Sequence, residues 1–394
     1  MFRELTLENF RAFQNLHLTG LGRVNLLVGA NNSGKTSVLE AIAFLATDGD
    51  PTMLFATLSR RGETTSFDPE NQSLAVDVRH LFFGRKLDDS GSLRLGAVRS
   101  SGEPVEFRLS TPRVPDEALS AWREAVKIGR RSRRGPGRGE APVIDLDRSE
   151  RIPRFLTIAV PGVPPVNVPL LLNHGLTAFN AATPIEQNRP MVLLPTAGVA
   201  DDELAGRFDK IAATAEEDRV VAALQEIEPG ITRLRTVQVG SLGTDRGFIV
   251  AMEGTSEPVP LGSLGDGVHR LLAIALSLVT ARGGYVLVDE IDTGLHHTVM
   301  RKMWKLIFET AKRLDVTVFA TTHSYDCVHA LSAIAPPPDR ACGEVSLIRV
   351  ERGNPVGVHF SEEEIRRLAE WQLDDARQCD ARHDGDLSSR VAGR

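Results

Sequence analysis

The residues best suited to chemistry form a glycine-rich loop near the N-terminus, Gly29-Ala30-Asn31-Asn32-Ser33-Gly34-Lys35-Thr36. The loop matches the pattern G-x-x-x-x-G-K-[ST], in which backbone N–H groups surround phosphates, the lysine reaches the β and γ oxygens, and the last hydroxyl holds Mg²⁺. A chance match in a glycine-rich turn is the competing interpretation. We expect the nucleotide to be contacted by Gly29, Asn31, Asn32, Ser33, Gly34, Lys35, Thr36 and Ser37, with Thr36 also a metal ligand.

The elements around this loop must place it at the N-terminus of a helix. Residues 24–28 form an apolar run that predicts a buried strand leading into the loop, and residues 37–45 carry the apolar spacing of a helix. Because the helix dipole and the free amide groups favour anions, the phosphates would lie on the first turn of that helix. This strand–loop–helix context favours a nucleotide site over a chance match.

Two adjacent carboxylates, Asp289 and Glu290, follow an apolar run at residues 284–288 that predicts a strand. Strand alternation points neighbouring side chains to opposite faces, so the two acids can serve different partners. Beside the phosphate loop, Asp289 can hold Mg²⁺ through its water shell, and Glu290 can polarise the attacking water. An ordinary strand followed by an acidic turn is the alternative, and the phosphate loop in the same chain favours the catalytic interpretation.

A third apolar run, at residues 316–324, predicts a strand with polar residues at its tip, among them His323. A predicted helix at residues 299–314 separates this run from the acidic strand, as in one strand–helix–strand unit. At the end of such a strand, His323 could hydrogen-bond the γ-phosphate and the attacking water. A lone histidine at a strand end is more often a surface residue, so its distance beyond Glu290 carries this catalytic prediction.

The segment before the acidic strand, residues 261–270, contains Ser263, Gly265 and Gly267. A predicted helix follows at residues 271–279, so the serine and the glycines would form a second anion site at a helix N-terminus. One chain does not need two such helix ends for one phosphate tail. We therefore expect this segment to close over a nucleotide that a second copy of the chain holds.

Composition indicates a cytoplasmic globular protein. The chain has 394 residues, of which 42% are hydrophobic and 25% charged, and its net charge of −6 argues against a polycation that coats nucleic acid. Three scattered cysteines argue against a disulfide framework and a zinc site. The sequence lacks an apolar run of about 18 residues and therefore predicts no membrane-spanning helix.

Together these motifs resemble the ABC-type ATPase heads of the RecF and OLD (overcoming lysogenisation defect) group, often labelled AAA-family ATPases of defence systems. The resemblance covers roughly residues 1–50 and 235–335. It implies that Asp289-Glu290 is the Walker B motif, Ser263 begins the signature, residues 292–297 form the D-loop and His323 is the switch histidine. It also implies that Arg11, in a first hairpin at residues 7–13, lies near the nucleotide.

The fold that the resemblance implies is an α/β head, in which helices flank a mixed sheet and an inserted α+β or helical middle region interrupts the head. ATP and Mg²⁺ would be held between two heads in a homodimer or a higher oligomer, each signature closing the other's site. The inserted region would contain a flexible basic segment at 127–142 and a helical run at 201–228. We expect four regions: a first half of the head at 1–110, the insertion at 111–233, a second half of the head at 234–360, and a short helix with a disordered tail at 361–394.

Three features depart from that family pattern. The signature reads Ser263-Leu264-Gly265-Asp266-Gly267, with an acid between its glycines, and no Q-loop glutamine is assigned, although Gln72 and Gln187 are both candidates. OLD enzymes carry a Toprim nuclease after the ATPase, and too few residues follow position 326 here for that domain. We therefore expect any nuclease to be a separate polypeptide.

The sequence predicts an ATPase that dimerises on ATP and acts on DNA or on a separately encoded nuclease or effector, as in phage defence or repair. The alternative is a scaffold that binds ATP to hold or restrain a partner nuclease or toxin with little turnover. Possible DNA contacts lie in the basic segment, although a solvated loop explains the same composition. These contacts would be Arg130, Arg131, Arg133, Arg134 and Arg138.

Overall fold

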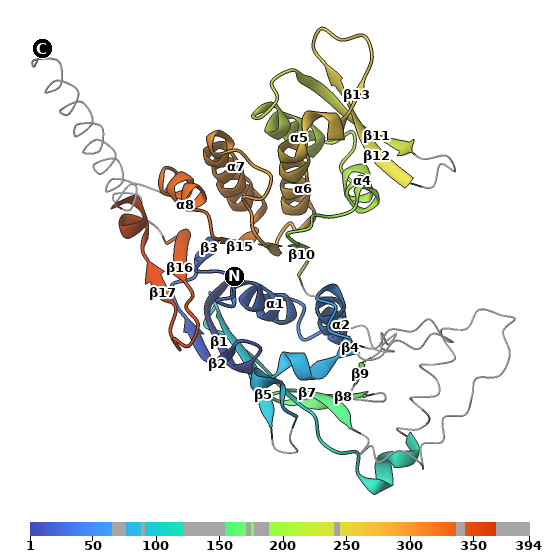
Figure 1. Ribbon diagram of the computed structural model, residues 1–394, viewed down its shortest axis with the longest axis vertical. Coiled ribbons are helices and arrows are strands. Elements are labelled where there is room, and N and C mark those ends of the chain that lie inside the picture. Colours follow the sequence, from blue (N-terminus) through green and yellow to red (C-terminus); the bar gives the residue numbers. More distant parts are fainter. Residues whose placement is uncertain are drawn as a thin grey trace, which may run out of the picture.

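A computed structural model describes residues 1–64, 76–87, 91–121, 124, 154–170, 175–176, 189–239, 245–335 and 343–367. One layer is an antiparallel sheet in the order β2-β1-β5-β6-β7-β8, in which β1 pairs with both its sequence neighbour β2 and the more distant β5 (Figure 1). Its strands alternate buried and exposed side chains because only one face packs on the core. The strands are β1 (Phe2–Phe10), β2 (Phe13–Leu18), β5 (Ser92–Arg99), β6 (Pro104–Ser110), β7 (Phe155–Val160) and β8 (Val163–Pro169).

The second layer is a mixed sheet in the order β10-β14-β15-β3-β16-β17. All neighbouring pairs are parallel except β16 with β17. Helices cover both faces, and the inner strands β3, β14 and β15 are therefore buried along nearly their whole length, as predicted for residues 24–28. The strands are β3 (Val24–Val28), β10 (Met191–Leu194), β14 (Tyr285–Val288), β15 (Thr317–Thr322), β16 (Val345–Arg349) and β17 (Val358–Phe360).

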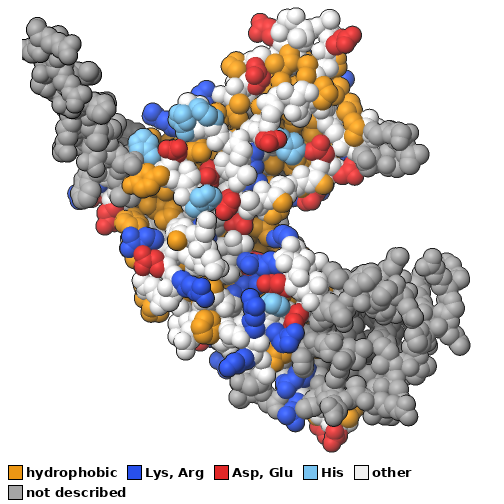
Figure 2. All heavy atoms as spheres, viewed as in Figure 1, with side chains coloured by type: hydrophobic (Ala, Val, Ile, Leu, Met, Phe, Trp, Pro, Cys, Tyr) orange, Lys and Arg blue, Asp and Glu red, His pale blue; other side chains and the backbone are white. Residues whose placement is uncertain are grey.

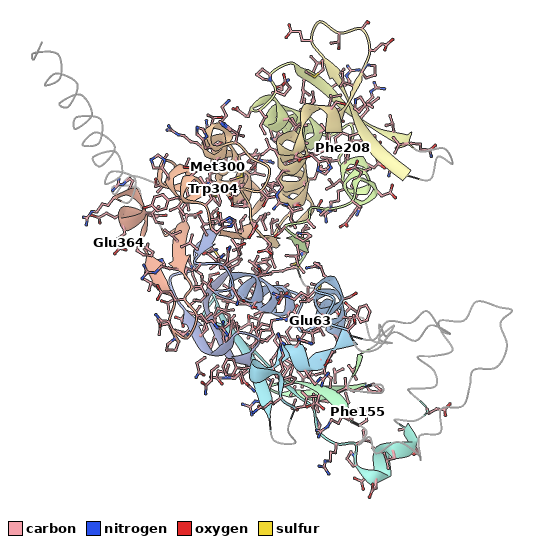
Figure 3. All side chains as sticks on the ribbon, viewed as in Figure 1. Glu63, Phe155, Phe208, Met300, Trp304 and Glu364 are labelled. Atoms are coloured by element: carbon pink, nitrogen blue, oxygen red, sulfur yellow. The ribbon has the colours of Figure 1, made fainter. Side chains whose placement is uncertain are left out.

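Helix α1 (Lys35–Ala46) lies between the two sheets and is buried over nearly its whole length (Figure 1). Its apolar side chains share one hydrophobic cluster with Leu5 of the antiparallel sheet and with Leu287 and Phe319 of the mixed sheet. Helices α6 (Asp266–Thr280), α7 (His297–Leu314) and α8 (Tyr325–Ser332) cover the opposite face. Figure 3 labels Trp304 of α7, whose indole Nε1 donates a hydrogen bond of 3.0 Å to the carbonyl oxygen of Cys327 on α8. The fold is therefore the α/β head with helices on both faces of a mixed sheet that the sequence predicted.

A third, antiparallel sheet of β11 (Ile231–Val239), β12 (Asp245–Met252) and β13 (Val259–Pro260) stands beyond α6 (Figure 1). The helical run predicted at 201–228 is two helices, α4 (Asp201–Asp209) and α5 (Ala215–Gln225). The break falls at Ala213, whose φ of 61° is incompatible with a continuing right-handed helix. Phe208, labelled in Figure 3, packs its ring edge to face against Phe248 of β12 and so joins α4 to this sheet.

The predicted insertion at 111–233 contributes strands to both large sheets. Strands β7 and β8 extend the antiparallel sheet beyond β6, and β10 is the edge strand of the mixed sheet beside β14. Shorter elements complete the described fold: α2 (Pro51–Arg60), β4 (Val76–Asp77), β9 (Gly175–Leu176), η1 (Val78–Leu81), η2 (Phe83–Arg85), η3 (Asp116–Ala118) and η5 (Leu261–Leu264).

The short helix predicted from residue 361 begins with a capping box. Glu364 accepts a hydrogen bond of 2.8 Å from the backbone N–H of Ser361, and the Ser361 hydroxyl accepts one of 3.4 Å from the Glu364 N–H. Cys327 is a free, buried thiol, and burial raises its pKa to about 12. Among the described helices, none combines the length and the apolarity that a bilayer crossing requires.

Candidate nucleotide site

The phosphate loop connects the end of β3 to the first residue of α1, as its sequence context predicted. Gly29 has a φ of 151° and Gly34 a φ of 102°, a region that favours glycine. Space imposes the same requirement, since a Cβ at Gly29 would lie 2.3 Å from the Val350 carbonyl oxygen and one at Gly34 would lie 2.4 Å from the Phe13 ring. Val350 and Phe13 of the same chain therefore pack closely against the loop, which wraps around the N-terminus of α1.

Two polar side chains of the phosphate loop are placed where they could bind an anion. The Lys35 ammonium donates hydrogen bonds of 2.8 Å and 3.1 Å to the carbonyl oxygens of Gly29 and Ala30, and burial lowers its pKa although Glu290 and Asp289 oppose that effect. The Ser33 hydroxyl is buried and has no hydrogen-bond partner among the described residues. A buried, unpaired hydroxyl beside a lysine and the N-terminus of α1 fits a phosphate group.

Asp289 lies at the centre of a cluster of hydroxyl groups. The Thr36 hydroxyl lies 3.1 Å from both of its carboxylate oxygens. Thr321 of β15 donates a hydrogen bond of 2.7 Å to Oδ1, and Thr196, just beyond β10, donates one of 3.2 Å to Oδ2. The structure thus brings together the two predicted metal ligands, Thr36 and Asp289, from positions far apart in the sequence.

This cluster suits Mg²⁺, which takes oxygen ligands and is usually held by one or two carboxylates together with substrate phosphates and waters. Thr36 and Asp289 would hold the ion, which supplies positive charge next to the phosphates when bound. No site of three or more His, Cys, Asp or Glu side chains occurs in the described part of the chain.

Glu290 and His323 face each other at the ends of β14 and β15. The His323 Nδ1 atom lies 3.4 Å from a carboxylate oxygen of Glu290, and both side chains are accessible, at 51% and 33% exposure. Glu290 has a φ of 47°, a left-handed conformation that costs a non-glycine residue free energy. His323 also lines, with Gly29 and Ala30, a pocket of about 340 Å³ between the phosphate loop and α8. The predicted base and the predicted sensor are therefore close together and reachable by water.

Thr196 and Thr321 are site residues that the sequence analysis did not single out. Thr321 belongs to the polar tip of a predicted strand, and its hydroxyl also accepts a hydrogen bond of 2.8 Å from the Glu290 N–H. Thr196 could be found only from topology, because β10 must first be placed beside β14. The Q-loop candidates Gln72 and Gln187 lie outside the described residues.

Arg11, predicted near the nucleotide, is held by carboxylates in this structure. Its Nε lies 2.6 Å from Oε2 of Glu40 on α1, without hydrogen-bond alignment, and its Nη1 donates a hydrogen bond of 3.0 Å to Glu63. Arg61 donates a hydrogen bond of 2.6 Å to the other oxygen of Glu40, and its charge also interacts with that of Asp289. Arg61 is thus a further cation that the sequence analysis missed, and a nucleotide contact by Arg11 stays a prediction.

The predicted signature lies at the start of α6. Ser263 is in η5, and α6 begins at Asp266 with Gly265 as its cap, without a side-chain capping bond. Gly267 packs on the predicted D-loop, since a Cβ there would lie 3.1 Å from the Gly294 carbonyl oxygen. The three predicted contacts Ser263, Gly265 and Gly267 form one surface segment. The basic segment with Arg130, Arg131, Arg133, Arg134 and Arg138 lies outside the described residues.

Two family models match the chain. A model described as AAA ATPase domain matches residues 1–110, and one described as AAA domain, putative AbiEii toxin, Type IV TA system, matches residues 204–326. An ATP/GTP phosphatase from Helicobacter pylori is 21% identical over 355 residues, which are 86% of this chain and 90% of that protein. The DNA replication and repair protein RecF from Thermomicrobium roseum is 55% identical over 47 residues, 12% of each chain. An SMC head bound to the C-winged helix domain of ScpA superposes with a TM-score of 0.49 at 13% identity, over 93% of this chain and 99% of that chain.

Proposed function

We propose that this chain, an ATPase of the ABC-type AAA group, binds ATP with Mg²⁺ at its phosphate loop and hydrolyses it to ADP and phosphate. One observation carries the proposal: the Thr36 hydroxyl, at the start of α1, lies 3.1 Å from Asp289 at the end of β14, and Glu290 is the next residue. Walker A and Walker B groups therefore meet at one point. Lys35, the loop N–H groups and Ser33 bind the β- and γ-phosphates.

Glu290 serves as the general base in this proposal. Its carboxylate is accessible to water, and its charge interacts with that of Lys35 in the phosphate loop, so it can orient the attacking water and accept its proton. His323 positions that water and the γ-phosphate from the adjacent strand. Phosphoryl transfer depends mainly on positioning and on charge stabilisation, which suits a site built from fixed backbone and short side chains.

The reaction requires a second copy of the chain. The exposed start of α6 carries Gly265 at a helix cap without a side-chain partner, and such a cap leaves N–H groups free for an anion. Asp266 adds a negative charge in the same turn, so contact with phosphates there would need the cation of the partner's Lys35 nearby. Two heads would thus enclose ATP between the phosphate loop of one and the signature of the other.

The dimer would act on DNA or on a separately encoded effector, in phage defence or DNA repair. Support comes from relatives: RecF is a DNA replication and repair protein, and one matched family model is described as a putative AbiEii toxin. ATP binding would assemble the dimer and engage the target, and hydrolysis would release it. The chain would then be an ATP-dependent switch, and the DNA or effector that it binds would determine the process that it controls.

The mass of the Glu290→Gln variant in solution tests this function. Glutamine keeps the shape of the side chain but cannot accept the proton, so ATP should stay bound and hold two copies together. We expect a dimer with ATP and Mg²⁺ and a smaller species with ADP. The Lys35→Ala variant is the control and should stay small with either nucleotide. An unchanged mass with ATP would contradict the dimeric switch.

A further inference from the structure

Arg270 is a buried cation on α6 without a carboxylate partner at ion-pair distance among the described residues. Only 6% of the residue is exposed, and burial lowers the pKa of its guanidinium, although Asp289, Asp292 and Glu290 oppose that effect. Burying an arginine is costly unless its N–H groups find acceptors. The hydrogen-bond acceptors of Arg270 should therefore account for its burial.

The acceptors of Arg270 are three backbone carbonyl oxygens at the ends of two neighbouring strands. Nη1 donates a hydrogen bond of 3.0 Å to Pro195, immediately after β10. Nη2 donates bonds of 2.8 Å and 2.9 Å to Asp289 and Glu290, immediately after β14. One side chain thus holds the two residues proposed to bind the metal and to activate water.

The peptide that Arg270 holds is already unusual. Glu290 has a φ of 47°, and a strained conformation of this kind persists only where surrounding groups fix it. On the β15 side, Thr321 accepts the Glu290 N–H at 2.8 Å. On the α6 side, Arg270 binds the Glu290 carbonyl oxygen. The backbone of the proposed base is therefore fixed from both neighbouring elements.

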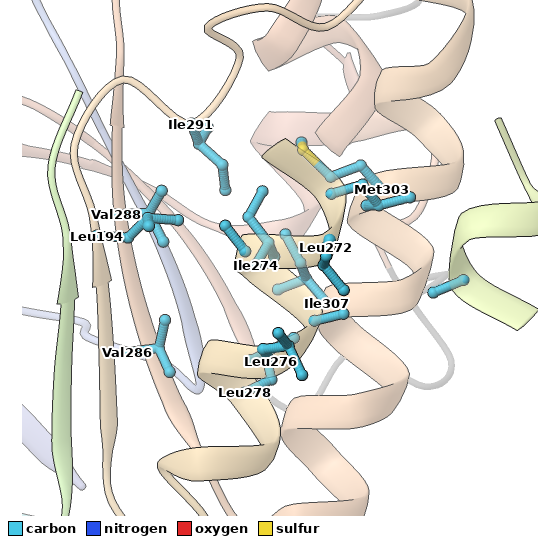
Figure 4. Packing of buried hydrophobic residues seen from close by; sticks show 14 of the residues in the cluster. Leu194, Leu272, Ile274, Leu276, Leu278, Val286, Val288, Ile291, Met303 and Ile307 are labelled. Carbon is cyan, nitrogen blue, oxygen red and sulfur yellow. The ribbon is translucent and has the colours of Figure 1, made fainter. Parts of the chain in front are cut away.

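Helix α6 is itself rigidly placed. Leu272, Ile274 and Leu276 are buried between β14 and α7 (Figure 4). Its first turn touches the predicted D-loop, where Gly267 meets Gly294. Arg270 lies one turn further along, so a contact made at the start of α6 reaches the Glu290 peptide through one stiff element.

We propose that Arg270 is a positioning residue that sets the conformation of the Asp289–Glu290 peptide and links it to the first turn of α6. This inference rests on the proposed function, since it assigns no chemistry to Arg270 itself. Glu290 acts on water, and Arg270 acts through the Glu290 backbone. A ligand at the start of α6 would then alter hydrolysis in the same chain.

Arg270→Met tests this role against Arg207→Met. Arg207 is a matched control because it also contacts α6, with a hydrogen bond of 3.0 Å to Ser277, but lies away from the site. A misplacement of about 1 Å costs about 100-fold in rate, so Arg270→Met should lower kcat about 100-fold. The Kd for a non-hydrolysable ATP analogue should change less than about threefold, since Arg270 is proposed to affect the catalytic step and not the binding of the nucleotide in its ground state. Arg207→Met should keep its kcat.

Arg270→Lys keeps the charge and is the variant to use if Arg270→Met does not fold. Its kcat should be about 10-fold lower than that of the wild type, because a lysine ammonium cannot reproduce the planar set of donors of the guanidinium. In a Glu290→Gln background, Arg270→Met should cause a much smaller further loss than in the wild type, since the general base is already gone and only the placement of Asp289 is still affected. Equal losses in both backgrounds, or parallel falls in kcat and analogue binding, would show a structural role only. Full turnover by Glu290→Gln would overturn the proposed function, whereas an inactive Glu290→Gln beside a fully active Arg270→Met would overturn this inference alone.

Discussion

Replacing Glu40 with glutamine should destabilise the protein by about 3 kcal/mol, the lower end of the range for breaking a buried ion pair. Glu40 and Arg11 are each only 5% exposed, and Arg61 shares the same carboxylate. Glutamine keeps an oxygen for the Arg61 hydrogen bond, but it leaves Glu63 as the only carboxylate in contact with the Arg11 guanidinium among the described residues. The lower end of the range applies because Glu63 remains and Arg61 is 34% exposed to water.

Thermal unfolding measures this effect, because at about 2 °C per kcal/mol the midpoint should fall by about 6 °C. Glu309→Gln is the control: its contact with Lys305 spans 4.0 Å between exposed side chains, so the midpoint should stay within about 1 °C. Equal midpoints for Glu40→Gln and the wild type would refute the reasoning. The Arg11–Glu40 contact would then contribute no net stability to the fold.

Three further predictions concern nucleotide binding at the site and DNA binding by the basic segment. Gly34→Ala should abolish binding of an ATP analogue in calorimetry while the chain stays folded, because the new Cβ would lie 2.4 Å from the Phe13 ring at a φ of 102°; retained affinity would contradict the close packing. Burial lowers the pKa of Lys35 from 10.5, so nucleotide affinity should begin to fall at a pH below that value as the ammonium loses its proton, and Lys35→Arg should shift the loss to higher pH. Serine at Arg130, Arg131, Arg133, Arg134 and Arg138 should weaken DNA binding and reduce the log–log salt slope by about 0.9 per lost contact, and an unchanged slope would leave the segment as a plain loop.

The local parts of the site could be predicted because each depends on a few neighbouring residues. The spacing of the glycines and the lysine identifies the phosphate loop in the sequence, and the structure shows that a Cβ at Gly29 or Gly34 would clash with neighbouring atoms. Asp289 and Glu290 end an apolar strand, and parallel strands place their ends at one edge of a sheet. The strand–loop–helix context and the strand-end carboxylates therefore predicted the meeting of Thr36 with Asp289, whereas the mixed sheet was implied by the family resemblance.

The contacts that depend on strand order could not be predicted in the same way. Thr196 joins the site only because β10, from the predicted insertion, pairs with β14. Arg270 appears in the sequence as one more polar residue near the start of a helix, and its three carbonyl acceptors belong to two different strands. Arg11 was assigned from a resemblance, whereas its partners Glu40 and Glu63 are brought to it by tertiary packing.

The rate of ATP hydrolysis by the Glu290→Gln variant tests the central claim most directly. The Glu290 side chain is 33% exposed and lies 3.4 Å from His323, in a position to accept the proton of the attacking water. If it is the general base, the steady-state rate of phosphate release should fall by about 100-fold to 10,000-fold, while the Kd for ATP stays within a few-fold of the wild-type value. A rate equal to that of the wild type, with the same Kd, would contradict the account.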